Sequence, residues 1–145
     1  MTSVQFYHNA ANPLALACEL VARAYASGRR IAVRTADAAS AKHLDDALWT
    51  FQPGGFIPHV QLGTPLSRET PVVVAHAQTA SDWPHHDLLF NLANDAPADF
   101  CEFRTVVEIV GQGDDDRFAA RGRWMHYKSQ GAEMKAFDAV LRERI

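Results

Sequence analysis

The sequence predicts an α/β fold, a three-layer α/β/α sandwich around a mostly parallel sheet. Residues 4–50 alternate short β-type runs with amphipathic helical segments, an order typical of parallel strands joined by right-handed crossovers. Residues 72–75, Val-Val-Val-Ala, form a continuous apolar run, which is typical of a strand buried on both faces. The length of 145 residues, 48% of them hydrophobic, suits one domain with a substantial core. We therefore predict a single Rossmann-like domain over residues 1–145.

Residues 4–8 predict the first strand, and the turn after it prepares a helix. Asn12 is a helix-capping residue, and Pro13 suits the first helical position because its φ angle is already helical. Apolar residues then recur at helical spacing as far as Ser27-Gly28, where the glycine ends the helix. The predicted buried stripe of this helix is Leu14, Cys18, Val21, Ala22 and Tyr25.

The following segments repeat this pattern. Residues 31–35 predict a second strand, and Asp37 begins a second helix that ends near Trp49. After the apolar strand at residues 72–75, further strands are predicted at residues 87–92 and 104–110.

Two helices are predicted at the end of the chain. Asp114, Asp115 and Asp116 follow a glycine-containing break and place negative charge at the positive N-terminal end of a helix that runs to about Gln130. Gly131 is its C-terminal cap. The segment 132–145 has the apolar spacing of another amphipathic helix packed on the core, through Met134, Phe137, Val140 and Leu141.

Net charge, cysteine content and the distribution of apolar residues limit the classes of protein to which this chain can belong. The formal net charge of −3 gives no global attraction to nucleic acid, so a DNA contact would need a local basic patch. Cys18 and Cys101 lack metal-ligand spacing, and we expect both to be reduced, buried thiols of a cytoplasmic protein. No apolar run reaches the ~20 residues of a membrane span, and residues 1–4 lack the pattern of a signal peptide.

The residues predict neither a cofactor nor an active site. The turn at residues 9–13 contains no glycine, and no Gly-x-Gly-x-x-Gly or Walker pattern occurs elsewhere, so bound dinucleotide or ATP is not expected. No Gly-x-Ser-x-Gly elbow accompanies the scattered serines and histidines. Asp45 and Asp46 are adjacent on a helix and face different ways, so they do not form a two-metal pair. We expect no catalytic residue and no metal.

The histidine-containing region from His76 to His86 is the basis of an alternative function, a small α/β enzyme. His85 and His86 precede Asp87, but adjacent strand residues point to opposite faces and cannot easily aim at one ion. A partly exposed loop before a strand is the preferred interpretation.

An aromatic cluster surrounds a Pro-Gly-Gly break at residues 53–55 and consists of Trp49, Phe51 and Phe56. Ile57 and Pro58 follow in the same loop, which the proline stiffens. Two interpretations stay open: the aromatic side chains fold back onto the core, or part of the cluster anchors another protein.

The helix at residues 116–130 carries a basic face at helical spacing, formed by Arg117, Arg121, Trp124 and Lys128. Phe118 and Met125 lie on a neighbouring stripe that suits the core. The basic face is either simply solvated or a docking face for an acidic peptide with an apolar tip. A third alternative is single-stranded nucleic acid, for which one aromatic residue makes a very short stacking track.

Short motifs along nearly the whole chain match one known family in order and spacing: Phe6-Tyr7, Ser27-Gly28-Arg29-Arg30, Leu44-Asp-Asp-Ala-Leu-Trp49, Phe56-Ile-Pro58-His59, Arg121 and Tyr127-Lys128. They resemble the chi subunit of the bacterial DNA polymerase III holoenzyme. The resemblance implies a Rossmann-like fold and a non-catalytic accessory subunit of a DNA-directed DNA polymerase complex, acting in DNA replication.

The resemblance implies that the late helix binds the acidic C-terminal tail of single-stranded DNA-binding protein, which ends in an apolar residue with a free carboxylate. Arg121 matches a family arginine, and Trp124 stands where an aromatic residue is usual. Met125 replaces an expected lysine, for which Arg117, Arg123 or Lys128 could compensate. The implied tail-binding residues are Arg117, Arg121, Trp124 and Lys128.

The resemblance also implies a surface for psi, the small subunit that links chi to the clamp loader. The matching residues are Trp49, Phe56 and Pro58. Some family members bind a helicase-like repair protein through the same surface. The expected protein is an adaptor between the clamp loader and protein-coated single-stranded DNA, so its DNA contact is mainly indirect and no membrane partner is implied.

Overall fold

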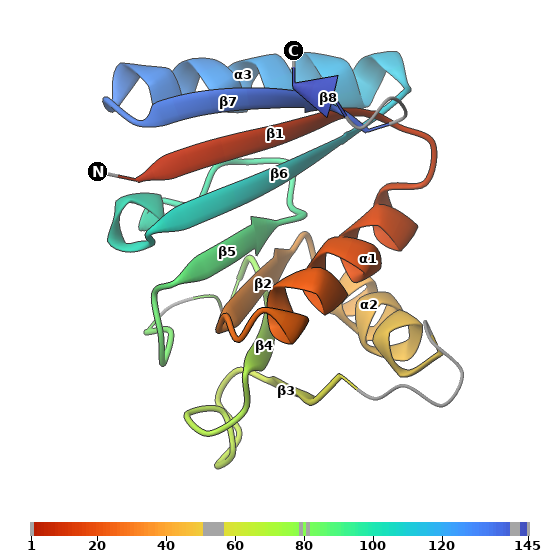
Figure 1. The fold of residues 1–145 in the computed structure, drawn as a ribbon, viewed down its shortest axis with the longest axis vertical. Helices are drawn as coiled ribbons and strands as arrows, with labels where there is room; N and C mark the ends of the chain where they lie inside the picture. Colours follow the sequence, from red (N-terminus) through yellow and green to blue (C-terminus); the bar gives the residue numbers. More distant parts are fainter. Residues whose placement is uncertain (1, 51–56, 79, 81, 140–142, 145) are drawn as a thin grey trace.

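A twisted sheet runs through the protein, with helices on both of its faces (Figure 1). The structure is a computed structural model that describes residues 2–50, 57–78, 80, 82–139 and 143–144. In this part of the chain the sheet has eight strands in the order β3-β4-β2-β5-β6-β1-β7-β8. The strands are β1 (Ser3–Ala10), β2 (Ile31–Thr35), β3 (His59–Gln61), β4 (Val72–His76), β5 (Leu88–Asn91), β6 (Thr105–Gly111), β7 (Glu133–Asp138) and β8 (Glu143–Arg144). Adjacent strands are parallel, except that β8 runs antiparallel to β7.

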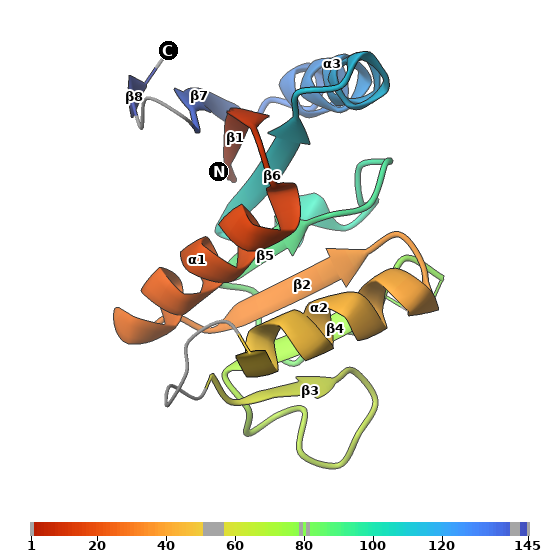
Figure 2. The same cartoon turned by 90° about the vertical axis from the view of Figure 1, so that its right-hand side faces the viewer.

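The helices divide between the two faces of the sheet. Helices α1 (Pro13–Ala26) and α2 (Ala38–Thr50) pack on one face, where Ala17 and Leu44 are fully buried (Figure 2). Helix α3 (Asp114–Ser129) and the short 3₁₀ helix η1 (Phe100–Glu102) cover the other face. Each face has its own apolar cluster, because alternate residues of every buried strand point to opposite sides. The predicted mostly parallel α/β/α sandwich is confirmed.

The first two helices begin at the capping residues that the sequence predicted. The side chain of Asn12 accepts a hydrogen bond from the backbone N–H of Ala15 at 3.1 Å, and Pro13 opens α1. Asp37 precedes α2 and accepts from the N–H of Ser40 at 2.8 Å, which lowers the pKa of the Asp37 carboxyl. Gly28 follows the C-cap residue of α1 with a φ of 85°, which glycine adopts without strain.

The N-terminal end of α3 differs in detail from the prediction. Asp114, Asp115 and Asp116 do form its first turn, but the N-cap position is Gly113, which has no capping side chain. The three carboxylates therefore stabilise the helix through its dipole.

The prediction of a C-terminal helix was wrong. Residues 133–138 form β7, which pairs in parallel with β1 along its length, and the helical spacing of apolar residues is coincidental there. The ring of Phe137 stacks on that of Tyr7 at 5.0 Å between centroids, on the face opposite α3. The strand satisfies the backbone groups of β1, which would otherwise be a long edge strand. Val140 and Leu141 lie outside the described residues.

Two further features differ from the sequence predictions. Cys18 is buried in α1 as expected, and burial raises its pKa to about 11, but Cys101 is exposed on η1. The short strand β3 was not predicted, because three residues after a proline carry little β-type signal. No helix in the described residues is long and apolar enough to cross a membrane.

Candidate functional site

Helix α3 presents a different side to the sheet from the one predicted. Its buried residues are Ala120, Arg123 and Tyr127. Phe118 and Met125, which the sequence placed toward the core, are instead 78% and 63% exposed. Compared with the prediction, the helix is therefore rotated, so that Phe118 and Met125 face solvent and the charged residue Arg123 faces the sheet.

A buried carboxylate in β6 explains this rotation. Glu108 has no exposed surface, and its Oε1 accepts a hydrogen bond from Nε of Arg123 at 2.9 Å. Its Oε2 accepts hydrogen bonds from the hydroxyl of Tyr127 and from Nδ2 of Asn91, the latter at 2.8 Å. A buried charge must be paired and hydrogen-bonded to be tolerated, so Arg123 and Tyr127 have to point inward.

The electrostatics of this buried cluster follow from its burial. Removal from water raises the pKa of Glu108, while the Arg123 guanidinium and the donors from Asn91 and Tyr127 oppose that rise. Burial and the neighbouring Glu108 carboxylate raise the pKa of Tyr127, so its hydroxyl stays a donor. The sequence suggested that Arg123 could compensate for the expected lysine that Met125 replaces. This interpretation was wrong, because the Arg123 guanidinium is buried and paired with Glu108.

The cluster extends along the carboxyl ends of the central strands. Arg34 of β2 is buried, and its Nη1 donates to Oδ1 of Asn91 at 3.0 Å. Its Nη2 also lies 3.1 Å from a carboxylate oxygen of Asp95. Sequence reasoning did not find this cluster, although one acidic residue inside the apolar run Val-Val-Glu-Ile-Val was a signal for it.

A groove lies between α3 and the carboxyl ends of β1 and β7. We call it the α3 groove; its volume is about 710 Å³, and its lining includes His8, Arg117, Arg121, Trp124, Met125 and Asp138. Three of the predicted tail-binding residues, Arg117, Arg121 and Trp124, are thus brought together. Lys128 is exposed on the last turn of α3 and does not line the groove.

Aromatic contacts fix the wall of the α3 groove. The indole of Trp124 meets the buried ring of Phe6 edge-on, with 5.1 Å between centroids. His8 stacks on Phe6 at 5.7 Å and approaches Trp124 at 6.4 Å. The groove therefore combines guanidinium groups on an exposed rim with an apolar wall that is already ordered by packing.

A second surface surrounds Trp49 at the end of α2, and we call it the Trp49 surface. Trp49 is 56% exposed, and its ring meets that of His59 edge-on at 5.4 Å. The His59 side chain is 1% exposed, and its Nε2 lies 2.9 Å from Oδ1 of Asp45. Because Asp45 belongs to α2, this contact ties the start of β3 to the helix that carries the tryptophan.

The structure describes only part of the predicted psi-binding set. Trp49 is exposed and Pro58 is partly exposed, whereas Ile57 is buried. Phe51 and Phe56 lie outside the described residues.

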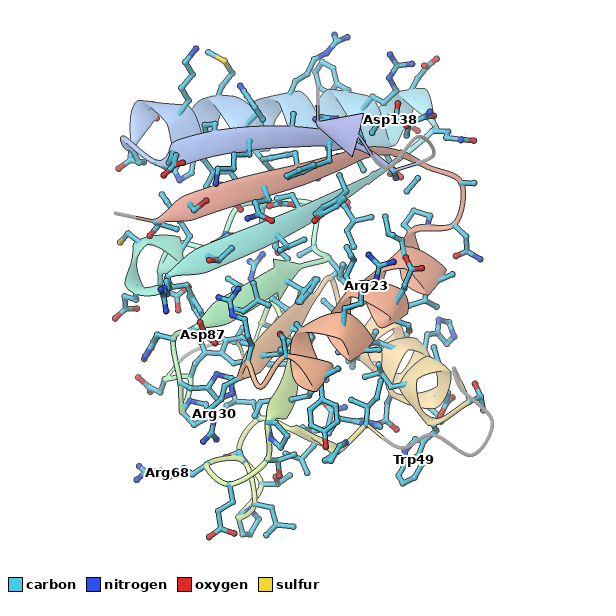
Figure 3. The ribbon with its side chains drawn as sticks, in the orientation of Figure 1. Arg23, Arg30, Trp49, Arg68, Asp87 and Asp138 are labelled. Atoms are coloured by element: carbon cyan, nitrogen blue, oxygen red, sulfur yellow. The ribbon has the colours of Figure 1, made fainter. Side chains whose placement is uncertain are left out.

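The α3 groove and the Trp49 surface lie at opposite ends of the molecule. Helix α3 packs against β6 and β7, while α2 packs over β2 and β4 toward the other end of the strand order (Figure 1). Figure 3 labels one residue of each surface, Asp138 beside α3 and Trp49 at the far end. Two partners could therefore bind without contacting each other.

The histidine-containing region is divided among separate contacts. Nδ1 of His76 lies 2.8 Å from Oε1 of Gln78. Burial, with the nearby Arg30 guanidinium, lowers the pKa of His85 to about 4. Arg29 and Asp87 form a bidentate ion pair, in which Nη2 of Arg29 lies 2.7 Å from Oδ1 of Asp87. Within the described residues no three His, Cys, Asp or Glu side chains are grouped as metal ligands.

Comparison with known proteins agrees with the resemblance that the short sequence motifs indicate. A family model described as "DNA polymerase III chi subunit, HolC" matches residues 1–135. DNA polymerase III subunit chi of Pseudomonas aeruginosa is 35% identical over 135 residues, covering 90% of this chain and 92% of the relative. The subunit chi of Escherichia coli is 33% identical over 117 residues, covering 80% and 78%. That of Haemophilus influenzae is 28% identical over 116 residues, covering 80% of each chain. The chain therefore belongs to the DNA polymerase III chi subunit family.

Proposed function

We propose that this chain is a non-catalytic adaptor of the cytoplasmic replicative polymerase. One end binds the acidic C-terminal tail of single-stranded DNA-binding protein in the α3 groove, and the other binds psi, the link to the clamp loader, at the Trp49 surface. The observation that carries this proposal is the separation of these two exposed surfaces at the two ends of one sheet.

The chemistry of the α3 groove supports an acidic peptide with an apolar end. Arg117 and Arg121 supply guanidinium groups, which pair with carboxylates through geometrically matched hydrogen bonds. Trp124 and Met125 supply apolar area beside them. The packed ring of Phe6 holds Trp124 in place, so little side-chain entropy is lost when a ligand arrives.

The Trp49 surface supports a protein partner. An indole left 56% exposed is the type of residue that dominates interface energetics once it is covered. Its contact with His59 limits its rotation, which also favours binding. A helicase-like repair protein that uses this surface would compete with psi.

The tail proposal is tested by fluorescence anisotropy with a labelled peptide that copies the tail of the organism's single-stranded DNA-binding protein. We expect saturable binding that weakens at least tenfold in Arg121→Ala and in Trp124→Ala, since each loses about 1.4 kcal/mol or more of contact. Arg23→Ala is the matched control, an exposed arginine on α1 that should leave binding unchanged. Met125→Lys should tighten binding by adding a cation to the groove lining. Absence of binding by the wild type would refute this half of the proposal.

The psi proposal needs a separate experiment, co-purification with psi from the same organism. Trp49→Ala should abolish a stable complex while leaving tail binding intact, because the two surfaces are far apart. Leu66→Ala is the control, a similarly exposed apolar residue in the segment that follows β3. Retention of psi by Trp49→Ala would show that the partner binds elsewhere.

A further inference from the structure

Helix α3 exposes large apolar side chains on the face that points away from the sheet. Phe118 is 78% exposed and Met125 is 63% exposed. They lie about two helical turns apart, so they stand on one side of the helix. In both views α3 lies along one end of the molecule, and no described element covers its outer side (Figure 1, Figure 2). Apolar side chains grouped on a surface, unlike single ones, indicate a contact site.

Gly122 lies between these two side chains, and the packing of the described residues does not require a glycine there. Within those residues no atom lies within 4 Å of the place that a Cβ would take. A glycine in the middle of a helix weakens the helix relative to alanine, because its backbone loses more freedom on folding. A residue without a side chain does allow another backbone to approach closely. Gly122 is therefore suited to be the crossing point of a second helix.

The charges of α3 favour one direction for such a helix. Asp114 and Asp115 are exposed in its first turn, and Lys128 is exposed in its last. An identical helix that runs in the opposite direction places its lysine beside these carboxylates, and the same contact is repeated at the other end. Arg117 and Arg121 lie toward the α3 groove, at the side of the outer face, so their guanidinium groups can stay in water.

The same antiparallel arrangement matches the apolar side chains. Phe118 and Met125 stand symmetrically about the centre of α3, which falls between residues 121 and 122. A twofold axis at this point brings Phe118 of each copy onto Met125 of the other. A hollow of about 440 Å³ beside Phe118, in the N-terminal half of α3, gives the incoming methionine a place. Methionine suits this position because its flexible thioether packs well against an aromatic ring.

We propose that two copies of this chain form an antiparallel dimer through the outer face of α3, with Phe118, Gly122 and Met125 at its centre. A second copy is the partner that this face specifies, because each charged or apolar group finds its complement at the symmetric position of the same helix. The dimer does not depend on the proposed function. It has one consequence for that function: Met125 also lines the α3 groove, so the dimer covers part of the surface that the tail uses.

Sedimentation equilibrium of the whole chain, from about 10 µM to 1 mM, measures this association. One helix pair is a small interface, so we expect a weak dimer with a Kd of about 100 µM. The average mass should rise from 16.0 kDa toward twice that value. Phe118→Gln should raise the Kd at least about tenfold, because it removes the ring that covers the partner's methionine. Leu66→Gln is the control, an apolar residue 57% exposed in the segment after β3, and should leave the Kd unchanged.

Gly122→Gln separates dimer formation from the folding of α3. Glutamine favours a helix more than glycine does, and in the single chain its side chain meets open space. The urea midpoint of the variant should therefore equal or exceed that of the wild type. The same side chain holds a second helix away, so the Kd of the dimer should rise at least about tenfold.

Exchanged charges test the antiparallel direction. Asp114→Lys and Lys128→Glu should each weaken the dimer by about 3- to 10-fold, because like charges then meet at both ends of the contact. An equimolar mixture of the two variants should form a heterodimer as stable as the wild-type dimer, since each end then joins a lysine to a carboxylate.

Two results would overturn the proposal. One is a wild type that keeps a mass of 16.0 kDa up to about 1 mM, a concentration at which even a weak dimer forms. The other is a dimer that persists in both Phe118→Gln and Gly122→Gln, which would show that the copies meet through another surface. Because these experiments contain no tail peptide, neither result bears on the proposed function.

Discussion

Replacing Arg123 by methionine tests whether the buried ion pair holds α3 on the sheet. Arg123 is 7% exposed, and its guanidinium bonds Glu108 at 2.9 Å and the carbonyl of Asn94 at 3.1 Å. Methionine keeps much of the length and apolar stem but leaves Glu108 as a fully buried carboxylate without its cation. Removing one partner of a buried pair costs about 3–5 kcal/mol, a large part of the roughly 5–15 kcal/mol that holds a domain folded.

The loss should depend on pH. In Arg123→Met the pKa of Glu108 in the folded state rises further above its ordinary value of 4.5, because the guanidinium no longer opposes burial. A group with a raised folded pKa stabilises the protein fully below its unfolded pKa and loses that contribution as the pH rises through the folded pKa. The variant should therefore approach the wild type in stability near pH 4 and differ most above neutrality.

Urea unfolding monitored by tryptophan fluorescence and circular dichroism measures the change, as a lower midpoint at constant m value. Arg121→Met is the matched control, an exposed arginine two positions earlier that should change stability by no more than about 0.5 kcal/mol. Adding Glu108→Gln to Arg123→Met should restore most of the loss, since no unpaired charge remains. A cost below about 1 kcal/mol for Arg123→Met at pH 7 would refute the assigned role of the pair.

Three further results are expected. Tyr127→Phe removes the O–H that donates to buried Glu108 and should cost about 1–3 kcal/mol in the same urea experiment; an unchanged midpoint would mean that water replaces the hydroxyl. At pH 8 a thiol reagent should modify exposed Cys101 rapidly and Cys18 only after unfolding, because burial raises the pKa of Cys18 to about 11; fast modification of a Cys101→Ser variant would contradict this. Asn12→Ala should cost about 1 kcal/mol by removing the cap of α1, while Asn12→Ser should be nearly neutral, and equal losses in both would show that the cap hydrogen bond is not the cause.

Local signals were sufficient for most of the fold. Asn12 with Pro13, Asp37 and Gly28 mark helix ends through bonds or angles confined to a few neighbouring residues, so they are readable without the rest of the chain. The apolar run at residues 72–75 predicted a strand buried on both faces, because only such a strand needs every side chain to be apolar.

Two errors, the C-terminal helix and the buried side of α3, share one cause, which is contact between segments that are distant in the sequence. The segment from Glu133 has an ambiguous apolar spacing, and it becomes a strand because β1, at the other end of the chain, offers it a free edge. The prediction that Phe118 and Met125 face the core failed because Glu108, in another element, requires Arg123 and Tyr127 to be turned inward.

The sequence by itself determined the α/β class, the ends of α1 and α2 and the buried strands. It also placed Arg121 and Trp124 on one face of a helix. All of these depend on spacing along the chain. Tertiary structure alone decided which side of α3 faces solvent and that Lys128 lies outside the α3 groove. It also brought His8 beside Asp138, although the two residues lie near opposite ends of the sequence. The physical reason is that burial of a charge and exposure of a groove depend on what lies across the sheet, and no local pattern records that.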